Sequence, residues 1–94
     1  MNCLPMERAD LIRNKEYRLS KIQIDLFNEV EQFMKKNELN RTVLEQKFGI
    51  SRNQINQILD GKANLTISEL VNLSLALGLA PHISFEDLLF NNEL

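Results

Sequence analysis

Apolar side chains recur every three or four positions over most of this chain, which is the pattern of helices that bury one face. The most regular series comprises Ile22, Leu26, Val30, Phe33 and Met34. A second series comprises Ile67, Leu70, Val71, Ser74 and Leu77. Because each series forms a stripe that must be covered, the two predict helices that share one core. Residues 6–18 mix charged and apolar side chains and predict a more exposed helix.

Capping residues predict where these helices begin. A Ser or Thr followed three positions later by Gln or Glu can form a capping box, in which each side chain accepts a hydrogen bond from an otherwise unpaired backbone N–H. Three pairs have this spacing: Ser20 with Gln23, Ser51 with Gln54, and Thr66 with Glu69. They predict helices that end near residues 37, 60 and 77. Asn40 is a candidate N-cap for a fourth, short helix over 41–48.

Glycines predict where three of these helices end, because glycine readily adopts the left-handed conformation that terminates many helices. They are Gly49, Gly61 and Gly78. Beyond Gly78, apolar and polar residues alternate over 81–85, which indicates a very short strand-like segment. Ser84 lies three positions before Asp87 and could cap a last helical turn that ends at Phe90.

The sequence therefore predicts an all-α fold, a compact bundle of about five helices with a helix-turn-helix, an extra N-terminal helix and a short extended C-terminal tail. We expect three parts: an N-terminal helical extension over 1–19, the helix-turn-helix domain over 20–78, and an acidic tail over 79–94 that contacts a second copy or a partner. The length of 94 residues, with 44% apolar and 26% charged side chains, fits one small globular domain. Because such a domain buries only a modest core, a dimer interface would supplement it.

Charge is distributed unevenly along the chain, although the net charge is only −2. In residues 1–40, seven Lys and Arg balance seven Asp and Glu. Residues 41–62 carry four basic and two acidic side chains, a net of 4 − 2 = +2, whereas residues 63–94 carry four acidic side chains and no Lys or Arg. A polyanion would therefore be attracted to the middle of the chain and repelled by its C-terminal third.

The two predicted helices on either side of Gly49 have the spacing of a helix-turn-helix. Inward contacts that would fix the angle between them come from Leu44, Phe48, Ile50, Ile55 and Ile58. The outward face of the second helix, 52–60, carries amides and a guanidinium, groups that bond base edges bidentately. These side chains are Arg52, Asn53, Asn56 and Gln57. The pattern favours a helix that reads the major groove of DNA.

The stretch LNRTVLEQKFGISRNQINQILDGKAN, Leu39 to Asn64, resembles the helix-turn-helix of the Cro and phage-repressor type, the xenobiotic-response-element family of bacterial transcriptional regulators. With its apolar flanks, the resemblance covers about residues 22–77. It implies a bundle of about five helices that binds operator DNA, usually as a homodimer. The base contacts that it implies are Ser51, Arg52, Asn53 and Gln57, and the phosphate contacts are Asn40, Arg41 and Lys62. Gln54 and Asn56 match positions that are used less consistently, and the box with Ser51 offers Gln54 a capping role instead.

Glu45 departs from this resemblance, because a small residue usually stands at its position, where the two helices cross closely. A buried and unpaired carboxylate would be costly. We therefore expect Glu45 either to reach water or to pair with Arg52 or Lys47.

The function expected is a sequence-specific DNA-binding regulator, a repressor that binds an inverted-repeat operator in double-stranded DNA as a homodimer. Two alternatives use the same fold: an antitoxin-like regulator that also neutralises a partner protein, and a protein-interaction adaptor. The role of residues 79–94 distinguishes the three functions, because large apolar side chains in an acidic tail need a covering surface. They are Ile83, Phe85, Leu88, Leu89 and Phe90.

Other function classes find little support in the sequence. The single His82 has no companion ligands for a metal site, and with one Cys and no phosphate-binding glycine loop the chain offers nothing for acid–base or nucleophilic catalysis. We therefore expect no enzymatic activity, no metal and no cofactor. No apolar run approaches the roughly 20 residues that cross a bilayer, and the N-terminal residues lack a signal-peptide pattern, which predicts a cytoplasmic protein without membrane contact.

Overall fold

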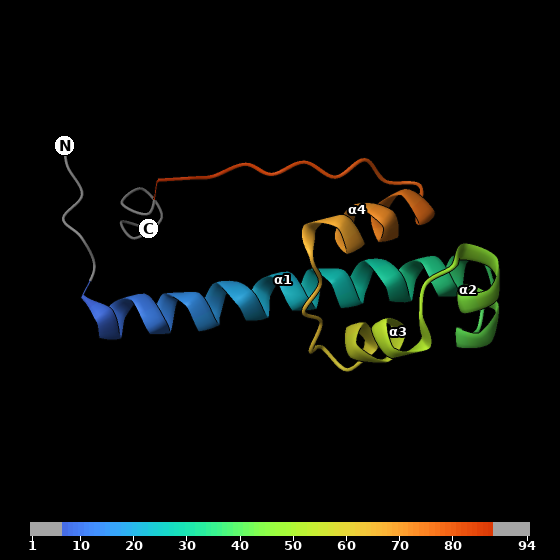
Figure 1. Ribbon diagram of the computed structural model, residues 1–94, viewed down its shortest axis with the longest axis horizontal. Coiled ribbons are helices and arrows are strands. Elements are labelled where there is room, and N and C mark those ends of the chain that lie inside the picture. Colours follow the sequence, from blue (N-terminus) through green and yellow to red (C-terminus); the bar gives the residue numbers. More distant parts are fainter. Residues whose placement is uncertain (1–6, 88–94) are drawn as a thin grey trace.

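The computed structural model describes residues 7–87, which form four helices and no strand (Figure 1). The helices are α1 (Arg8–Lys36), α2 (Arg41–Phe48), α3 (Arg52–Leu59) and α4 (Ile67–Ala76). The all-α prediction is confirmed, and three of the four helices lie within one or two residues of their predicted bounds. The number of helices differs from the expected five.

The difference lies in α1, which replaces the two separate helices predicted before residue 37. The helix runs through Ser20 without interruption, so the predicted capping box of Ser20 with Gln23 is wrong. Residues 8–36 contain no Gly or Pro, so nothing in the sequence terminates the first helix before Ser20. Gln23 instead donates from Nε2 to the carbonyl oxygen of Ala63, at 2.9 Å, and so links α1 to the loop before α4.

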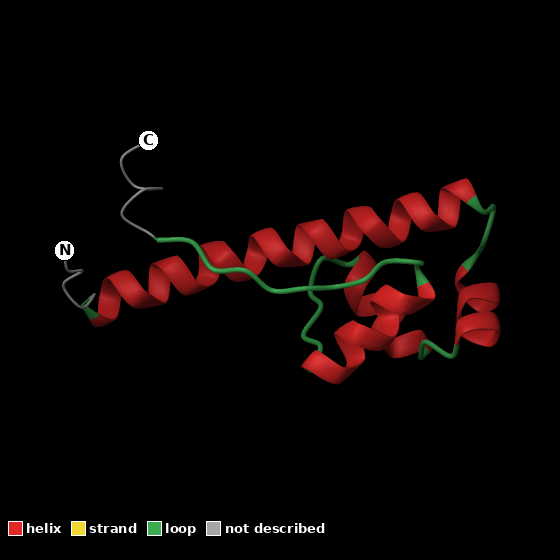
Figure 2. Ribbon diagram, turned by 90° about the horizontal axis from the view of Figure 1, so that it is seen from above, coloured by secondary structure: helices red, strands yellow, loops and turns green. Residues whose placement is uncertain are grey.

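The shape of the molecule is elongated, because only the C-terminal half of α1 is packed. Figures 1 and 2 show α2, α3 and α4 gathered around that half, while the N-terminal half extends away from them. The radius of gyration is 16.2 Å, compared with about 12 Å for a compact chain of this length. The N-terminal half of α1, residues 8–24, which we call the arm, lies outside the packed part of the bundle, and its exposure agrees with the more exposed helix predicted over 6–18.

The core forms where all four helices and their loops meet. Its buried side chains are Val30, Leu44, Ile50, Ile55, Ile58, Ala63 and Leu73. Around them lie partly buried residues, among which the rings of Phe33 in α1 and Phe48 in α2 make an edge-to-face contact with centroids 5.5 Å apart. The helix-turn-helix is therefore held against α1 by apolar packing.

Helix α4 buries a face slightly different from the predicted stripe. Leu73 is its buried residue, and Leu70 and Leu77 are half-buried beside it. Ile67 is 71% exposed and Val71 is also exposed, so these two members of the predicted stripe do not contribute to the core. Because the helix is short, a modest rotation moves the edge of the stripe into solvent.

The segment after α4 forms no strand within the described residues, and the strand predicted over 81–85 is wrong. Residues 79–87 instead run as an exposed loop from the end of α4 back toward the N-terminal end of α1, a course visible in both ribbon views (Figures 1 and 2). A strand needs an adjacent edge for its backbone hydrogen bonds, and the described chain is otherwise helical. The predicted last turn through Phe90 extends beyond the described residues.

Candidate nucleic-acid interface

A tight turn between α2 and α3 sets the position of the candidate reading helix. Gly49 ends α2 in the left-handed region, with φ 70° and ψ 21°, and its N–H donates to the carbonyl oxygen of Glu45. Ile50 then enters the core, and Ser51 caps α3 by accepting a hydrogen bond from the N–H of Gln54 at 3.1 Å. The predicted helix-turn-helix is thus present, with its second helix beginning at Arg52.

Helix α3 has one buried face and one polar face. Ile55 and Ile58 are buried against the core. Asn53 and Gln57 lie one turn apart, on the side of the helix opposite Ile55, because each is two residues or about 200° from it. Asn53 is exposed and Gln57 is half-buried. The structure therefore brings these two predicted base-reading amides together on the face that is turned away from the core.

Arg52, at the start of α3, contacts two side chains of α2, those of Thr42 and Glu45. Its Nη2 atom donates to Oγ1 of Thr42 at 2.8 Å and lies 3.4 Å from Oε1 of Glu45. Of the arrangements expected for Glu45, the pair with Arg52 is observed, and the carboxylate also reaches solvent. Both side chains of the pair remain substantially exposed, 45% for Arg52 and 40% for Glu45. The carboxylate therefore lies at the accessible edge of the interface and not in the core.

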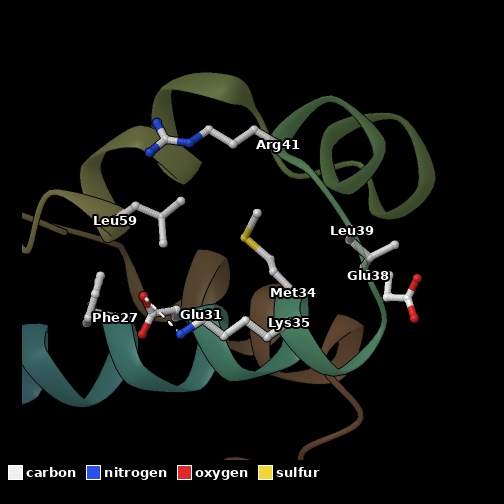
Figure 3. Close-up of a pocket in the computed structure, with 8 residues that line it drawn as sticks. All are labelled: Phe27, Glu31, Met34, Lys35, Glu38, Leu39, Arg41 and Leu59. Carbon is white, nitrogen blue, oxygen red and sulfur yellow. Dashed lines mark ion pairs between the residues drawn. The ribbon is translucent and has the colours of Figure 1, made fainter.

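A second link between the two helices joins Arg41 to Asn56. Nη1 of Arg41 donates to Oδ1 of Asn56, across fifteen residues of sequence. Figure 3 shows Arg41 extended above a cleft whose floor is α1 and whose walls include Met34 and Leu59. The cleft has a volume of about 450 Å³ and is lined by apolar and charged side chains. Arg41 thus has an intramolecular partner while its side chain remains exposed.

The remaining predicted contacts lie at the ends of the two helices. Asn40 caps α2, as predicted, because its Oδ1 accepts from the N–H of Val43 at 2.8 Å. Lys62 is exposed beyond the end of α3, and its N–H donates to the carbonyl oxygen of Gln57 at 2.8 Å, which holds this loop against the helix. An exposed cation therefore lies close to the C-terminal end of the candidate reading helix.

Gln54 occupies a different environment from the other predicted residues. It is half-buried and lines a cleft of about 500 Å³ between the turn and α4, which Glu69 and Asn72 also line. The return bond that would complete a capping box with Ser51 is not formed, whereas the predicted box of Thr66 with Glu69 has both bonds, at 3.1 and 2.8 Å. Gln54 therefore borders the α4 side of the motif.

Three side-chain contacts at this interface were not predicted from the sequence: Thr42 with Arg52, Arg41 with Asn56, and Gln23 with Ala63. Each joins residues ten or more positions apart, so each depends on the crossing of the helices. A helix-turn-helix spacing predicts that α2 and α3 touch, but it does not predict which polar side chains meet. Among the polar side-chain contacts between α2 and α3, only the ion pair of Glu45 with Arg52 could be predicted from the sequence, because a carboxylate at a close crossing needs a cation nearby.

Within 7–87 no group of His, Cys, Asp and Glu side chains is placed to hold a metal ion. No helix in the same range has the length and apolarity needed to cross a membrane.

Comparison with known proteins gives one match. A family described as Helix-turn-helix matches residues 30–83, which span the C-terminal end of α1, both helices of the motif, α4 and the beginning of the following loop. Neither a curated protein nor a solved structure was found to match the chain. The matched range contains all the predicted base and phosphate contacts, from Asn40 to Lys62.

Proposed function

This chain belongs to the helix-turn-helix family of the xenobiotic-response-element type, a family of DNA-binding domains, and from that premise we propose that it is a sequence-specific transcriptional regulator, a repressor that reads the major groove with α3. The observation that carries the proposal is the polar face of α3, where Asn53 and Gln57 lie opposite the buried Ile55. Amide side chains one turn apart on such a face can bond adenine bidentately.

Each polar residue of the interface has a proposed role. Base edges would be contacted by Ser51, Arg52, Asn53 and Gln57. Phosphates would be contacted by Asn40, Arg41 and Lys62. Asn56 is tied to Arg41 and Gln54 lines the cleft beside α4, which supports a secondary role for both. Phosphate contacts position a protein on DNA, whereas base contacts provide its sequence preference.

The charge of the chain supports this orientation on DNA. Residues 41–62 have a net charge of +2, and no Lys or Arg follows Lys62. The acidic residues after α4 would be repelled by phosphate and should lie away from the duplex. The cytoplasm, where operator DNA is accessible, remains the proposed location, and no cofactor is part of the proposal.

We also propose a homodimer, because one reading helix touches only a few base pairs. Two copies would place their α3 helices about 34 Å apart, one turn of DNA, and select an inverted repeat. The arm and the loop 79–87 supply an apolar surface for this contact. A groove of about 590 Å³ runs between them, with Ile22 from the arm and Ile83 and Phe85 from the loop among its lining residues.

A second copy is the proposed occupant of this groove on the basis of charge. The arm, residues 8–24, carries five basic and two acidic side chains, a net of 5 − 2 = +3, whereas the loop 79–87 carries two acidic and no basic side chains. In a symmetric pair, the basic arm of one copy can meet the acidic loop of the other, and the reverse contact follows from the two-fold axis. Leu11 lies three turns before Ile22 on the same face of α1 and is also exposed, so it extends this surface.

One observation favours a second function, the capture of a partner protein by the tail. Phe85 is 92% exposed and Ile83 is also exposed in a loop that contributes nothing to the core. An antitoxin-like regulator, or an adaptor that does not depend on DNA, would use this segment to bind its partner. We keep the division of the chain into parts 1–19, 20–78 and 79–94, and we assign DNA binding to 20–78.

Selection from a random pool of double-stranded DNA tests the main proposal. The purified chain should enrich one sequence, and that sequence should be an inverted repeat occupied by two chains in sedimentation experiments. Enrichment of no sequence would contradict sequence-specific binding and favour the adaptor. Enrichment of a site that is bound by a single chain would contradict the homodimer alone.

A further inference from the structure

The two contacts of Arg52 converge on one nitrogen of its guanidinium. Nη2 donates to Thr42 at 2.8 Å and is also the atom nearest Glu45, at 3.4 Å. A guanidinium binds a two-acceptor ligand through a pair of parallel N–H groups, either on Nη1 and Nη2 or on Nε and Nη2. Both pairs include Nη2. Nη2 carries two N–H groups, one in each pair, so the hydrogen bond to Thr42 leaves one pair available. Any ligand that binds Arg52 bidentately nevertheless uses Nη2, the atom that lies 3.4 Å from Oε1 of Glu45.

The position of Glu45 makes the competition depend on the charge of the ligand. A phosphate that binds Arg52 brings a full negative charge close to the carboxylate of Glu45, in a part of the surface that remains exposed. The O6 and N7 atoms of guanine accept the same two hydrogen bonds but belong to a neutral base. Glu45 therefore opposes the binding of a phosphate at Arg52 more strongly than the binding of guanine.

We propose that Glu45 is a specificity-determining residue, which holds Arg52 against α2 and keeps it from phosphates on nonspecific DNA while leaving it able to bind a guanine edge in the operator. This inference rests on the proposed function and adds a role for a residue outside the polar face of α3. Glu45 acts through Arg52 and is a positioning residue. Its effect is to lower the affinity for nonspecific DNA and so to widen the ratio between specific and nonspecific affinity.

Replacement of the carboxylate by its neutral isostere tests this role. The variant Glu45→Gln should bind scrambled DNA about three to ten times more tightly, with a salt slope steeper by about one ion, because Arg52 can then grip a phosphate. Affinity for the selected operator should change less, so that the ratio of the two affinities falls. The matched control is Glu31→Gln in α1, which removes the same charge from a carboxylate that is 41% exposed and paired with Lys35.

The control separates a local effect from a change in net charge. If Glu45→Gln raises operator and scrambled affinities by the same factor, or if Glu31→Gln does what Glu45→Gln does, the inference is overturned. Should Glu45→Gln fail to fold, Arg52→Ala provides the test, because the wild-type Arg52 is expected to contact a base and no phosphate. Arg52→Ala should then weaken operator binding and leave the affinity and salt slope for scrambled DNA unchanged, and a loss of one ion from that slope would overturn the inference.

The double variant Arg52→Ala with Glu45→Gln shows whether Glu45 acts through Arg52. In the absence of the guanidinium, Glu45→Gln should no longer change the ratio of affinities, and a persisting change would assign the effect to direct repulsion of DNA. Failure of this inference is distinct from failure of the proposed function. A chain that selects an operator but responds to none of these substitutions as described retains its function without the role of Glu45.

Discussion

Substitution of Gly49 by alanine tests the turn that sets the position of α3. Gly49 has a φ of +70°, a conformation that costs an L-residue about 1–2 kcal/mol. A Cβ atom at this position would meet nothing within 4 Å, so no steric term adds to that cost. Alanine also restricts the unfolded chain, which offsets about 0.4–1 kcal/mol. The free energy of unfolding should therefore fall by about 1 kcal/mol.

Thermal unfolding followed by circular dichroism measures this loss. A change of about 1 kcal/mol lowers the Tm of a domain of this size by about 4–8 °C. Gly49→Asn should lose less than Gly49→Ala, because asparagine tolerates the left-handed region. All variants are compared at one protein concentration, since a dimer makes the Tm depend on concentration.

Gly78 provides the matched control for this substitution. Its φ is +80° and its Cβ position is equally open, but it follows α4 and lies outside the helix-turn-helix. Gly78→Ala should lower the Tm by a similar amount, and both alanine variants should bind operator DNA with normal affinity below their transitions. A loss far above 1 kcal/mol at Gly49 alone, or loss of operator binding by folded Gly49→Ala, would refute the open left-handed turn described here.

Three further predictions concern the charge of Lys62, the tail, and the hydrogen bond that links α1 to the loop before α4. Lys62→Ala should weaken operator and scrambled complexes alike and reduce the slope of log affinity against log salt by about one ion, whereas a loss confined to the operator would assign Lys62 to base reading. Deletion of residues 79–94 should weaken self-association in sedimentation experiments; dimerisation as tight as that of the full chain, with no partner lost, would give the tail another purpose. Gln23→Ala should destabilise the fold by about 1 kcal/mol, because the carbonyl group of Ala63 loses its side-chain donor, and an unchanged Tm would contradict this contact.

The start of a helix could be predicted from a capping residue where the preceding helix has ended. Thr66 follows the turn at Gly61, and Asn40 follows a break after α1, and both form the predicted caps. Ser20 has the same local signal, but residues 8–19 before it can all remain helical. A capping residue must leave the helical conformation, and no residue near Ser20 requires the chain to do so.

Helix α1 is followed by a residue whose left-handed conformation could not be predicted from the sequence. Glu38 adopts a φ of +54°, unusual for a residue with a side chain, and the N–H of Leu39 donates to the carbonyl oxygen of Met34 at 2.8 Å. These contacts close the helix end without a glycine. The predicted end near residue 37 agrees with the structure because the apolar stripe stops there.

The candidate site was predictable at the level of helix faces and less so at the level of side-chain partners. Spacing from the apolar Ile55 was sufficient to assign Asn53 and Gln57 to the opposite face of α3. The partners of Arg52 depend on the crossing of α2 and α3, which apolar packing determines and which a single sequence does not specify. The exposure of residues 8–18 was predicted from their mixture of charged and apolar side chains, whereas Ile22 belongs to the predicted apolar stripe and is 55% exposed, because the elements packed on α1 cover only its C-terminal half.

The central claim, that α3 reads DNA sequence, is tested most directly by the ratio of operator to scrambled affinity in Asn53→Ala and Gln57→Ala. Each substitution removes an amide from the polar face of α3 and leaves the core contacts of Ile55 and Ile58 intact. The account predicts that each variant loses about 1–3 kcal/mol of discrimination, at one position of the operator, while binding to scrambled DNA is almost unchanged. If both variants retain the full operator preference of the wild-type chain, α3 does not read sequence and the claim is contradicted.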